Sequence, residues 1–207
     1  LTAGAGGSWE GHREEGGVSK VFRPLIEQDV YQAGLNLTFG NFAVGGAFEL
    51  GFCGSACLAL SALLSSAFNK PTGYGQQFYY PHARLSYHLD LPAVMKGSSS
   101  ANNRTLEKLD LYGLLFGGPV FTHLGLATND NQLIIEGNDV SFGIGGGIGA
   151  NYFFTEHFFV GAEAAARYAR GTYTWRAVAG SYQLSATEAS WSASGLGVRF
   201  AVGARFP

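Results

Sequence analysis

Three residues with the chemical types of a nucleophilic triad occupy alternate positions of the stretch SYHLD. They are Ser86, His88 and Asp90, and period-two spacing places all three side chains on one face of a β-strand. Neighbours at i and i+2 along a strand are roughly 6.5 Å apart. A serine nucleophile and its histidine base need a direct bond of about 2.6–3.2 Å. The spacing therefore favours polar packing over catalysis, and we expect no enzyme activity.

Two further motifs have ordinary structural explanations. Cys53 and Cys57 have no histidine or second cysteine pair beside them, so a local disulfide in an oxidising compartment is favoured over a zinc site, with reduced thiols as the alternative. The run GIGGGIGA matches G-x-G-x-x-A through Gly145, Gly147 and Ala150. Strand-like residues follow it, whereas a dinucleotide site needs a helix there. We expect neither a metal nor a cofactor.

Charged side chains recur on one face of most predicted strands, opposite an apolar face. In the final stretch, GLGVRFAVGARFP, residues Phe200, Val202 and Phe206 are apolar, while Arg199 and Arg205 lie on the other face. Both signs of charge occur on these polar faces, so the groups can neutralise one another when they are buried. The predicted ion network consists of Glu10, Glu49, His82, Arg84, His88, Asp90, Glu163, Arg167, Arg199 and Arg205.

About eight strands carry these faces, and residues 1–207 form one domain. Period-two alternation predicts strands over residues 1–12, 31–40, 42–52, 79–91, 109–123, 140–153, 158–175 and 195–207. The strand at 109–123 is the least regular, because Leu114, Phe116 and Val120 interrupt the alternation. Pro119 in that stretch favours a strand end.

The predicted connectors alternate in length. Those after the first, third, fifth and seventh strands are long, and those after the second and sixth are tight. A short helix is expected beside the cysteines, in the connector after the third strand. The polar linker at 92–108, after the fourth strand, departs from the alternation. One rim of short turns and one of long loops is typical of membrane barrels.

The composition indicates which face meets the surroundings. Hydrophobic residues make up 46% and charged residues only 14% of the chain, against roughly 25% charged in soluble domains. No apolar run approaches the roughly 20 residues of a membrane helix, whereas barrel strands need about 9–11. The net charge of −2 argues against a nucleic-acid partner. Apolar faces turned inward would leave a Gly- and Ser-rich exterior, so we place them outward in lipid, around a polar lumen.

The alternating strands, their even number and the C-terminal stretch resemble the small OmpA/OmpX/OmpW-type outer-membrane barrels of Gram-negative bacteria. The resemblance covers almost the whole length. It is most specific at Phe200, Val202 and Phe206, which look like the signal read by the barrel assembly machinery, although Pro207 follows the usual last phenylalanine. The resemblance implies an all-β, membrane-spanning, antiparallel up-and-down barrel in the bacterial outer membrane, in contact with lipid and lipopolysaccharide.

The resemblance implies no single function. The first hypothesis is a non-enzymatic barrel, with a lumen closed by ion pairs, whose extracellular loops contact lipopolysaccharide or a protein partner in an envelope complex. The second is a narrow OmpW-like channel for small solutes, and the third is a lipid-modifying enzyme. Outer-membrane lipid A deacylases keep a His and a Ser two residues apart on a strand, facing lipid. SYHLD has the opposite order and the opposite orientation.

Overall fold

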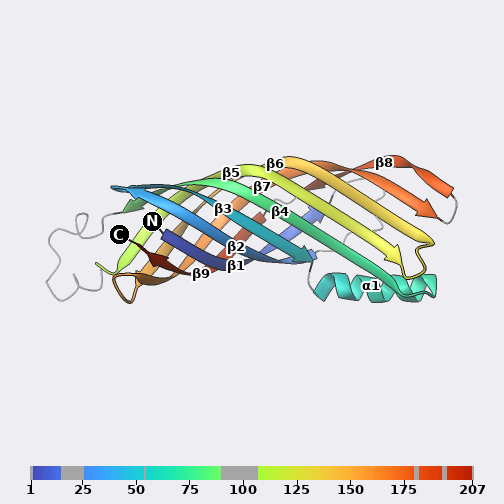
Figure 1. The fold of residues 1–207 in the computed structure, drawn as a ribbon, viewed down its shortest axis with the longest axis horizontal. Coiled ribbons are helices and arrows are strands. Elements are labelled where there is room, and N and C mark those ends of the chain that lie inside the picture. The colour runs from blue at the N-terminus through green and yellow to red at the C-terminus, as the bar shows by residue number, and fades with distance from the viewer. Residues whose placement is uncertain are drawn as a thin grey trace.

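The structure is a computed structural model that describes residues 2–14, 26–53, 55–89, 107–179, 182–192 and 195–206. These ranges contain nine strands in one antiparallel sheet and one helix (Figure 1). In chain order they are β1 (Thr2–Glu14), β2 (Ile26–Phe39), β3 (Phe42–Cys53), α1 (Ser55–Phe68), β4 (Thr72–Leu89), β5 (Leu109–Thr128), β6 (Leu133–Phe153), β7 (Phe158–Ala179), β8 (Tyr182–Ser192) and β9 (Gly195–Arg205). Within these ranges no helix has both the length and the hydropathy to cross a membrane.

The strands close into a ring of eight positions, because β8 and β9 together occupy one of them. β7 pairs with β9 near its start, where Phe158 lies opposite Ala204, and with β8 farther along the strand. β1 then pairs with β9 on one side and with β2 on the other, so that Thr2 lies opposite both Arg205 and Asn36. The predicted eight-stranded, antiparallel up-and-down barrel is confirmed.

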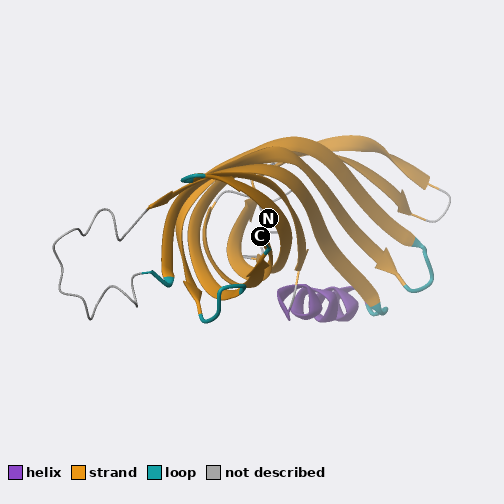
Figure 2. Ribbon diagram, turned by 60° about the vertical axis from the view of Figure 1, so that its left-hand side comes forward, coloured by secondary structure: helices purple, strands orange, loops and turns teal. Residues whose placement is uncertain are grey.

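The two rims of the barrel differ. Both chain ends lie at one rim, where residues 40–41 join β2 to β3 and residues 154–157 join β6 to β7 (Figure 1). Gly40 in the first of these turns has a φ of +60°, a conformation that glycine adopts without steric cost. The other rim carries α1 and the turn at 129–132 (Figure 2). The predicted tight turns and the helix beside the cysteines are therefore confirmed.

The strands extend farther toward the α1 rim than the sequence pattern predicts. β5, β6 and β7 contain 20, 21 and 22 residues, about twice the roughly 9–11 that cross a bilayer. Beyond the bilayer, outward side chains need not be apolar, so the alternation fades while the hydrogen-bonded ladder continues. The predicted long connectors after the fifth and seventh strands are wrong, since only residues 129–132 and 180–181 separate those strands from the next. Segments expected to be loop or turn but found as strand include 26–30, 72–77, 124–128 and 133–139.

Apolar side chains cover the outside of the barrel wall. Leu196, Phe200 and Ile148 are 82%, 71% and 70% exposed, and the other outward positions of the spanning strands follow the same pattern. Water would disfavour an apolar surface of this extent, whereas the hydrocarbon of a bilayer accommodates it. The predicted lipid-facing exterior is confirmed.

The lumen contains an apolar cluster beside the predicted polar groups. Leu114, Phe116 and Val120 of β5 point inward and are at most 4% exposed, and they pack with Phe78 and Tyr80 of β4. β5 is therefore apolar on both faces, which is why its sequence lacks a clean alternation.

Pro119 lies in the interior of β5, whereas the sequence predicts a strand end there. The ladder between β4 and β5 runs to the pair of Tyr79 and Phe121 and resumes at Ala83 and Gly117. Prolines at 81 and 119 have no amide N–H to donate, so the ladder is interrupted between these pairs without a change of register.

Glycines of β6 make room for large side chains of β5. Gly145 lies opposite Phe116, and Gly149 lies opposite Tyr112. A Cβ atom at Gly145 would be 2.3 Å from the Phe116 ring and 2.5 Å from the carbonyl oxygen of Ala166. Each ring therefore packs directly on bare backbone. The interpretation of GIGGGIGA as close interior packing is confirmed by the continuous strand that contains it.

The close contact at Gly145 can be tested by substitution. We expect Gly145→Ala to lower the free energy of unfolding by about 1–3 kcal/mol, because the added methyl overpacks the lumen against backbone as well as against a ring. Gly75→Ala is the matched control, since nothing lies within 4 Å of its Cβ position. Urea unfolding in detergent micelles measures both variants, and equal midpoints would contradict the proposed packing.

Candidate functional site

Glu49 of β3 is a fully buried carboxylate in the lumen, with 0% of its surface exposed. Arg167 of β7 donates from Nη1 to Glu49 Oε2 at 2.9 Å, and Arg199 Nη1 of β9 lies 2.7 Å from Oε1. His82 Nε2 is 3.9 Å from the same Oε1. The Arg167 guanidinium also lies 4.7 Å from the centroid of the Phe78 ring. Two cations thus compensate a charge that would be costly to bury alone.

Glu163 of β7 is the second buried carboxylate and is 6% exposed. Arg84 Nη2 of β4 donates to Glu163 Oε2, to which the Tyr112 hydroxyl also donates at 3.4 Å. Arg199 Nη1 lies 3.4 Å from Glu163 Oε1, so one guanidinium contacts both carboxylates. The same Nη1 donates to Gln32 Oε1 at 3.0 Å.

These contacts form one group, which we call the lumen network. It crosses the barrel, because β3 and β7 are four positions apart in a ring of eight. Three guanidinium groups face two carboxylates in it, and the apolar cluster of β4 and β5 fills the space beside it. The network consists of Glu49, His82, Arg84, Glu163, Arg167 and Arg199.

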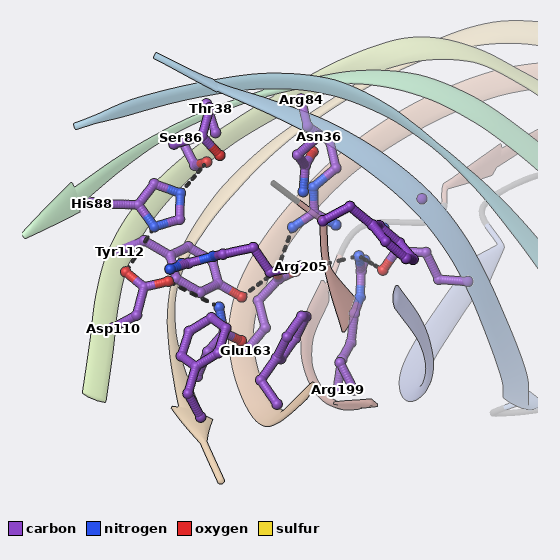
Figure 3. A pocket seen from close by; sticks show the side chains of 18 of the residues that line it. Asn36, Thr38, Arg84, Ser86, His88, Asp110, Tyr112, Glu163, Arg199 and Arg205 are labelled. Carbon is purple, nitrogen blue, oxygen red and sulfur yellow. Dashed lines mark hydrogen bonds and ion pairs between the residues drawn. The ribbon is translucent and has the colours of Figure 1, made fainter. Parts of the chain in front are cut away.

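A second polar group, the rim cluster, lies between the lumen network and the rim that holds the chain ends (Figure 3). His88 Nε2 is 3.0 Å from Ser86 Oγ, and His88 Nδ1 is 2.8 Å from Asp110 Oδ1. Asn151 Nδ2 donates to the other Asp110 oxygen at 3.2 Å. The rim cluster is Ser86, His88, Asp110 and Asn151.

The prediction that Ser86 and His88 are too far apart for a direct bond is wrong. The spacing of their backbones is that of a strand, but the imidazole reaches back along β4 and closes the distance to 3.0 Å. Asp110 occupies the position expected for Asp90, which lies outside the described residues. Tyr112 of β5 lies directly opposite His88 of β4. Asp110 is two residues before Tyr112, so it is the diagonal neighbour of His88 across the two strands.

A cavity of about 480 Å³ lies between the two groups (Figure 3). Arg84, Glu163 and Arg199 of the lumen network line it on one side, and the rim cluster lines it on another. Gly40 and Phe206 also line it, so it extends to the rim with the chain ends. This volume is within the range of small-ligand sites.

The structure brings six of the ten predicted ion-network residues together, as the lumen network. His88 belongs instead to the rim cluster. Arg205 lines the cavity near the rim, with its guanidinium 4.2 Å from the centroid of the Phe153 ring. Glu10 lies on β1, and its side chain is outside the described part of the chain, as is Asp90.

Other predicted residues remain untested in their roles. Phe200 and Val202 face outward from β9, and Phe206 follows its end, so the assembly signal stays a prediction. Cys57 is buried on α1, and the Cys53 side chain is outside the described residues, so the disulfide stays a prediction. In the described ranges no three His, Cys, Asp or Glu side chains are grouped to hold a metal ion.

Sequence reasoning missed Asp110 and Tyr112. Both are inward positions of β5, with the same parity as Leu114 and Phe116. Because that strand is apolar on both faces, its alternation did not show which of its faces points inward. The parity becomes clear only when β5 is aligned with β4, where Tyr112 lies opposite His88.

Comparisons with solved structures show the fold. A major outer membrane protein from Thermus thermophilus has a TM-score of 0.52 at 9% identity, covering 96% of this chain and 99% of that one. OprG from Pseudomonas aeruginosa has a TM-score of 0.49 at 14% identity, covering 99% and 95%. Neisserial surface protein A has a TM-score of 0.45 at 10% identity, covering 96% and 93%. No protein-family model and no curated protein matches the sequence.

The chain therefore has the fold of the small OmpA/OmpX/OmpW-type outer-membrane barrels. Its apolar exterior is that of a protein embedded in a lipid bilayer.

Removing one carboxylate tests the lumen network. We expect Glu49→Gln to lower the free energy of unfolding by about 3–5 kcal/mol, because two buried guanidinium groups lose their shared anion. Glu136→Gln on the exposed outer surface of β6 is the matched control and should change it by less than about 0.5 kcal/mol. Thermal and urea unfolding in micelles give both values. Equal stability of the two variants would show that the lumen network contributes nothing to the free energy of unfolding.

Proposed function

We propose that this protein is an integral outer-membrane barrel that is closed to solutes and acts at its outer rim, as a structural or partner-binding component of the cell envelope. The observation that carries the proposal is the lumen network. Glu49 and Arg199 are 0% and 3% exposed, in an interior that is only wide enough for side chains. A solute path would have to separate these buried ion pairs, which is costly.

The α1 rim supports a role in contacts outside the membrane. Strands β5 to β7, with 20 to 22 residues each, extend past the end of β3 on the side of α1 and form a wall there (Figure 1). Lys70 Nζ, after α1, donates to Asp130 Oδ2 at 2.6 Å and to Gln132 Oε1 at 2.7 Å in the β5–β6 turn. The hydrogen bond from Lys70 lowers the pKa of Asp130 to about 2, so the ion pair is retained far into acid and is lost only as the pH falls through that value.

Helix α1 supports contact with the lipid layer. Its Ser61 and Ser65 hydroxyls accept the Tyr74 and Thr72 amide hydrogens of β4 at 2.9 Å and 2.8 Å, which ties the helix to the barrel wall. Leu58 and Leu63 of the same helix are 74% and 68% exposed. We propose lipopolysaccharide and a protein partner as the contacts of this rim, and the barrel assembly machinery as the partner of the last strand.

The first test is conductance in a planar bilayer. We expect the refolded protein to insert, as shown by proteolysis and by heat-modifiable migration in electrophoresis, and to give no discrete openings, because the lumen network blocks it. Stable openings of the unmodified protein would overturn the proposal and favour a narrow channel for small solutes.

A charge-balanced variant is the matched positive control. Glu49→Ala combined with Arg199→Ala removes one anion and one cation from the middle of the lumen. We expect this double variant to conduct where the unmodified protein is silent. A folded double variant that is also silent would mean that other residues close the barrel.

A further inference from the structure

The hydrogen bonds of the rim cluster connect its groups in the same order as in a nucleophilic triad. The Asp110 carboxylate accepts hydrogen bonds only, so the 2.8 Å contact requires a proton on His88 Nδ1. In a neutral imidazole this leaves a lone pair on Nε2, and the Ser86 hydroxyl donates to it at 3.0 Å. Nucleophile, base and orienting carboxylate are thus connected through the same atoms as in serine hydrolases of several unrelated folds.

Further contacts hold the imidazole in place. Tyr112 stacks on His88, with ring centroids 5.2 Å apart and planes inclined by 29°. Asn151 fixes the Asp110 oxygen that does not bind His88. The His88 amide donates to the carbonyl of Asn41 in the β2–β3 turn at 2.7 Å, which fixes the end of β4. The geometry of the three groups is therefore supported by residues of β2–β3, β5 and β6.

Ser86 lines the cavity of about 480 Å³ that reaches the rim. Ala43 lies between Ser86 and Thr38 in the strand register, and its small side chain leaves the space in front of the hydroxyl open. Thr38 is two strands away from Ser86 in this register and lines the same cavity (Figure 3), and Arg84 lies two residues before Ser86 on the same strand face.

The charge of the cavity indicates the class of substrate. Arg84, Arg199 and Arg205 line it, while its carboxylates are Glu163, already bound to Arg84 and Arg199, and Asp110, bound to His88. A ligand that carries a negative charge is therefore favoured. The volume limits it to a small molecule.

We propose that the rim cluster is a hydrolytic site for small anionic carboxylic esters, with Ser86 as nucleophile, His88 as general base and Asp110 as positioning residue. This activity goes beyond the proposed closed-barrel function and is compatible with it, because the cavity extends to the rim with the chain ends, where Gly40 and Phe206 line it, and the lumen network borders it on another side. Ser86 Oγ attacks the ester carbonyl carbon, and its proton passes to His88 Nε2. The proton then leaves with the alcohol as the C–O bond breaks, and water attacks the Ser86 acyl ester by the same route to release the acid and restore the hydroxyl.

Covalent labelling of the full chain in micelles tests the nucleophile. A fluorophosphonate probe should form one adduct, located at Ser86 by peptide mass spectrometry, with loss of fluoride. Ser86→Ala should abolish labelling. Ser141→Ala is the matched control and should label like the unmodified protein, because the Ser141 hydroxyl is also buried inside the barrel but makes no hydrogen bond to the described residues.

The base and the positioning residue have separate readouts. We expect His88→Ala to slow labelling by on the order of 100-fold or more, with partial recovery on adding imidazole, which a merely structural role would not produce. Asp110→Asn should also slow labelling by on the order of 100-fold or more while the protein keeps its heat-modifiable migration.

The substrate class is tested with two nitrophenyl esters. We expect hydrolysis of the anionic 4-nitrophenyl hemisuccinate with a lower KM than for neutral 4-nitrophenyl acetate. Arg205→Gln should raise the KM for the anionic ester by a larger factor than the KM for the neutral ester. An inserted, folded protein that is unlabelled at Ser86 would overturn the proposal and leave the rim cluster as a structural hydrogen-bond chain. Conductance is measured independently, so this failure is distinguishable from failure of the closed-barrel proposal.

Discussion

Arg199 contacts both buried carboxylates of the lumen, and the interior of the barrel is organised around that contact. Glu49 and Glu163 come from strands on opposite sides of the ring, and neither charge would be tolerated alone in a dry interior. Closure of the ring brings β9 beside β7, which places Arg199 directly opposite Glu163. The last strand therefore supplies the cation that links the two sides. Burial of the charges is stable only in the complete barrel.

Large and small side chains are distributed unevenly around this network, and their distribution shapes the rest of the interior. β5 fills its side with large apolar groups, and β6 accepts them with glycines, so that Phe116 packs on the backbone at Gly145. This packing keeps water away from the network on one side. Toward the rim with the chain ends, the small residues Ala43 and Gly34 leave a cavity instead. The closed middle of the lumen and the cavity at the rim with the chain ends thus result from the same distribution of large and small side chains.

The two functional proposals concern different levels of this interior. In the first proposal the lumen network keeps solutes from crossing the membrane, and in the second the rim cluster supplies the chemistry at one mouth of the barrel. Arg84 belongs to the network and lines the cavity as well, so it joins the two levels. The α1 rim is a third level, where the extended strands and α1 form a surface, and the ion pair of Lys70 and Asp130 joins the end of α1 to the β5–β6 turn.

The faces of most strands follow from the local pattern of the chain. Period-two alternation in β2, β3, β6, β7 and β9 assigns each side chain to lipid or lumen from its neighbours alone, because successive residues of a strand point to opposite sides. Six of the predicted charged residues therefore meet in the lumen. The folded barrel shows which cation meets which anion, that Asp110 binds His88, and that β5 points large apolar side chains into the lumen. These pairings depend on strand register and ring closure, which join residues as distant as Gln32 and Arg199 and leave no local pattern in the chain.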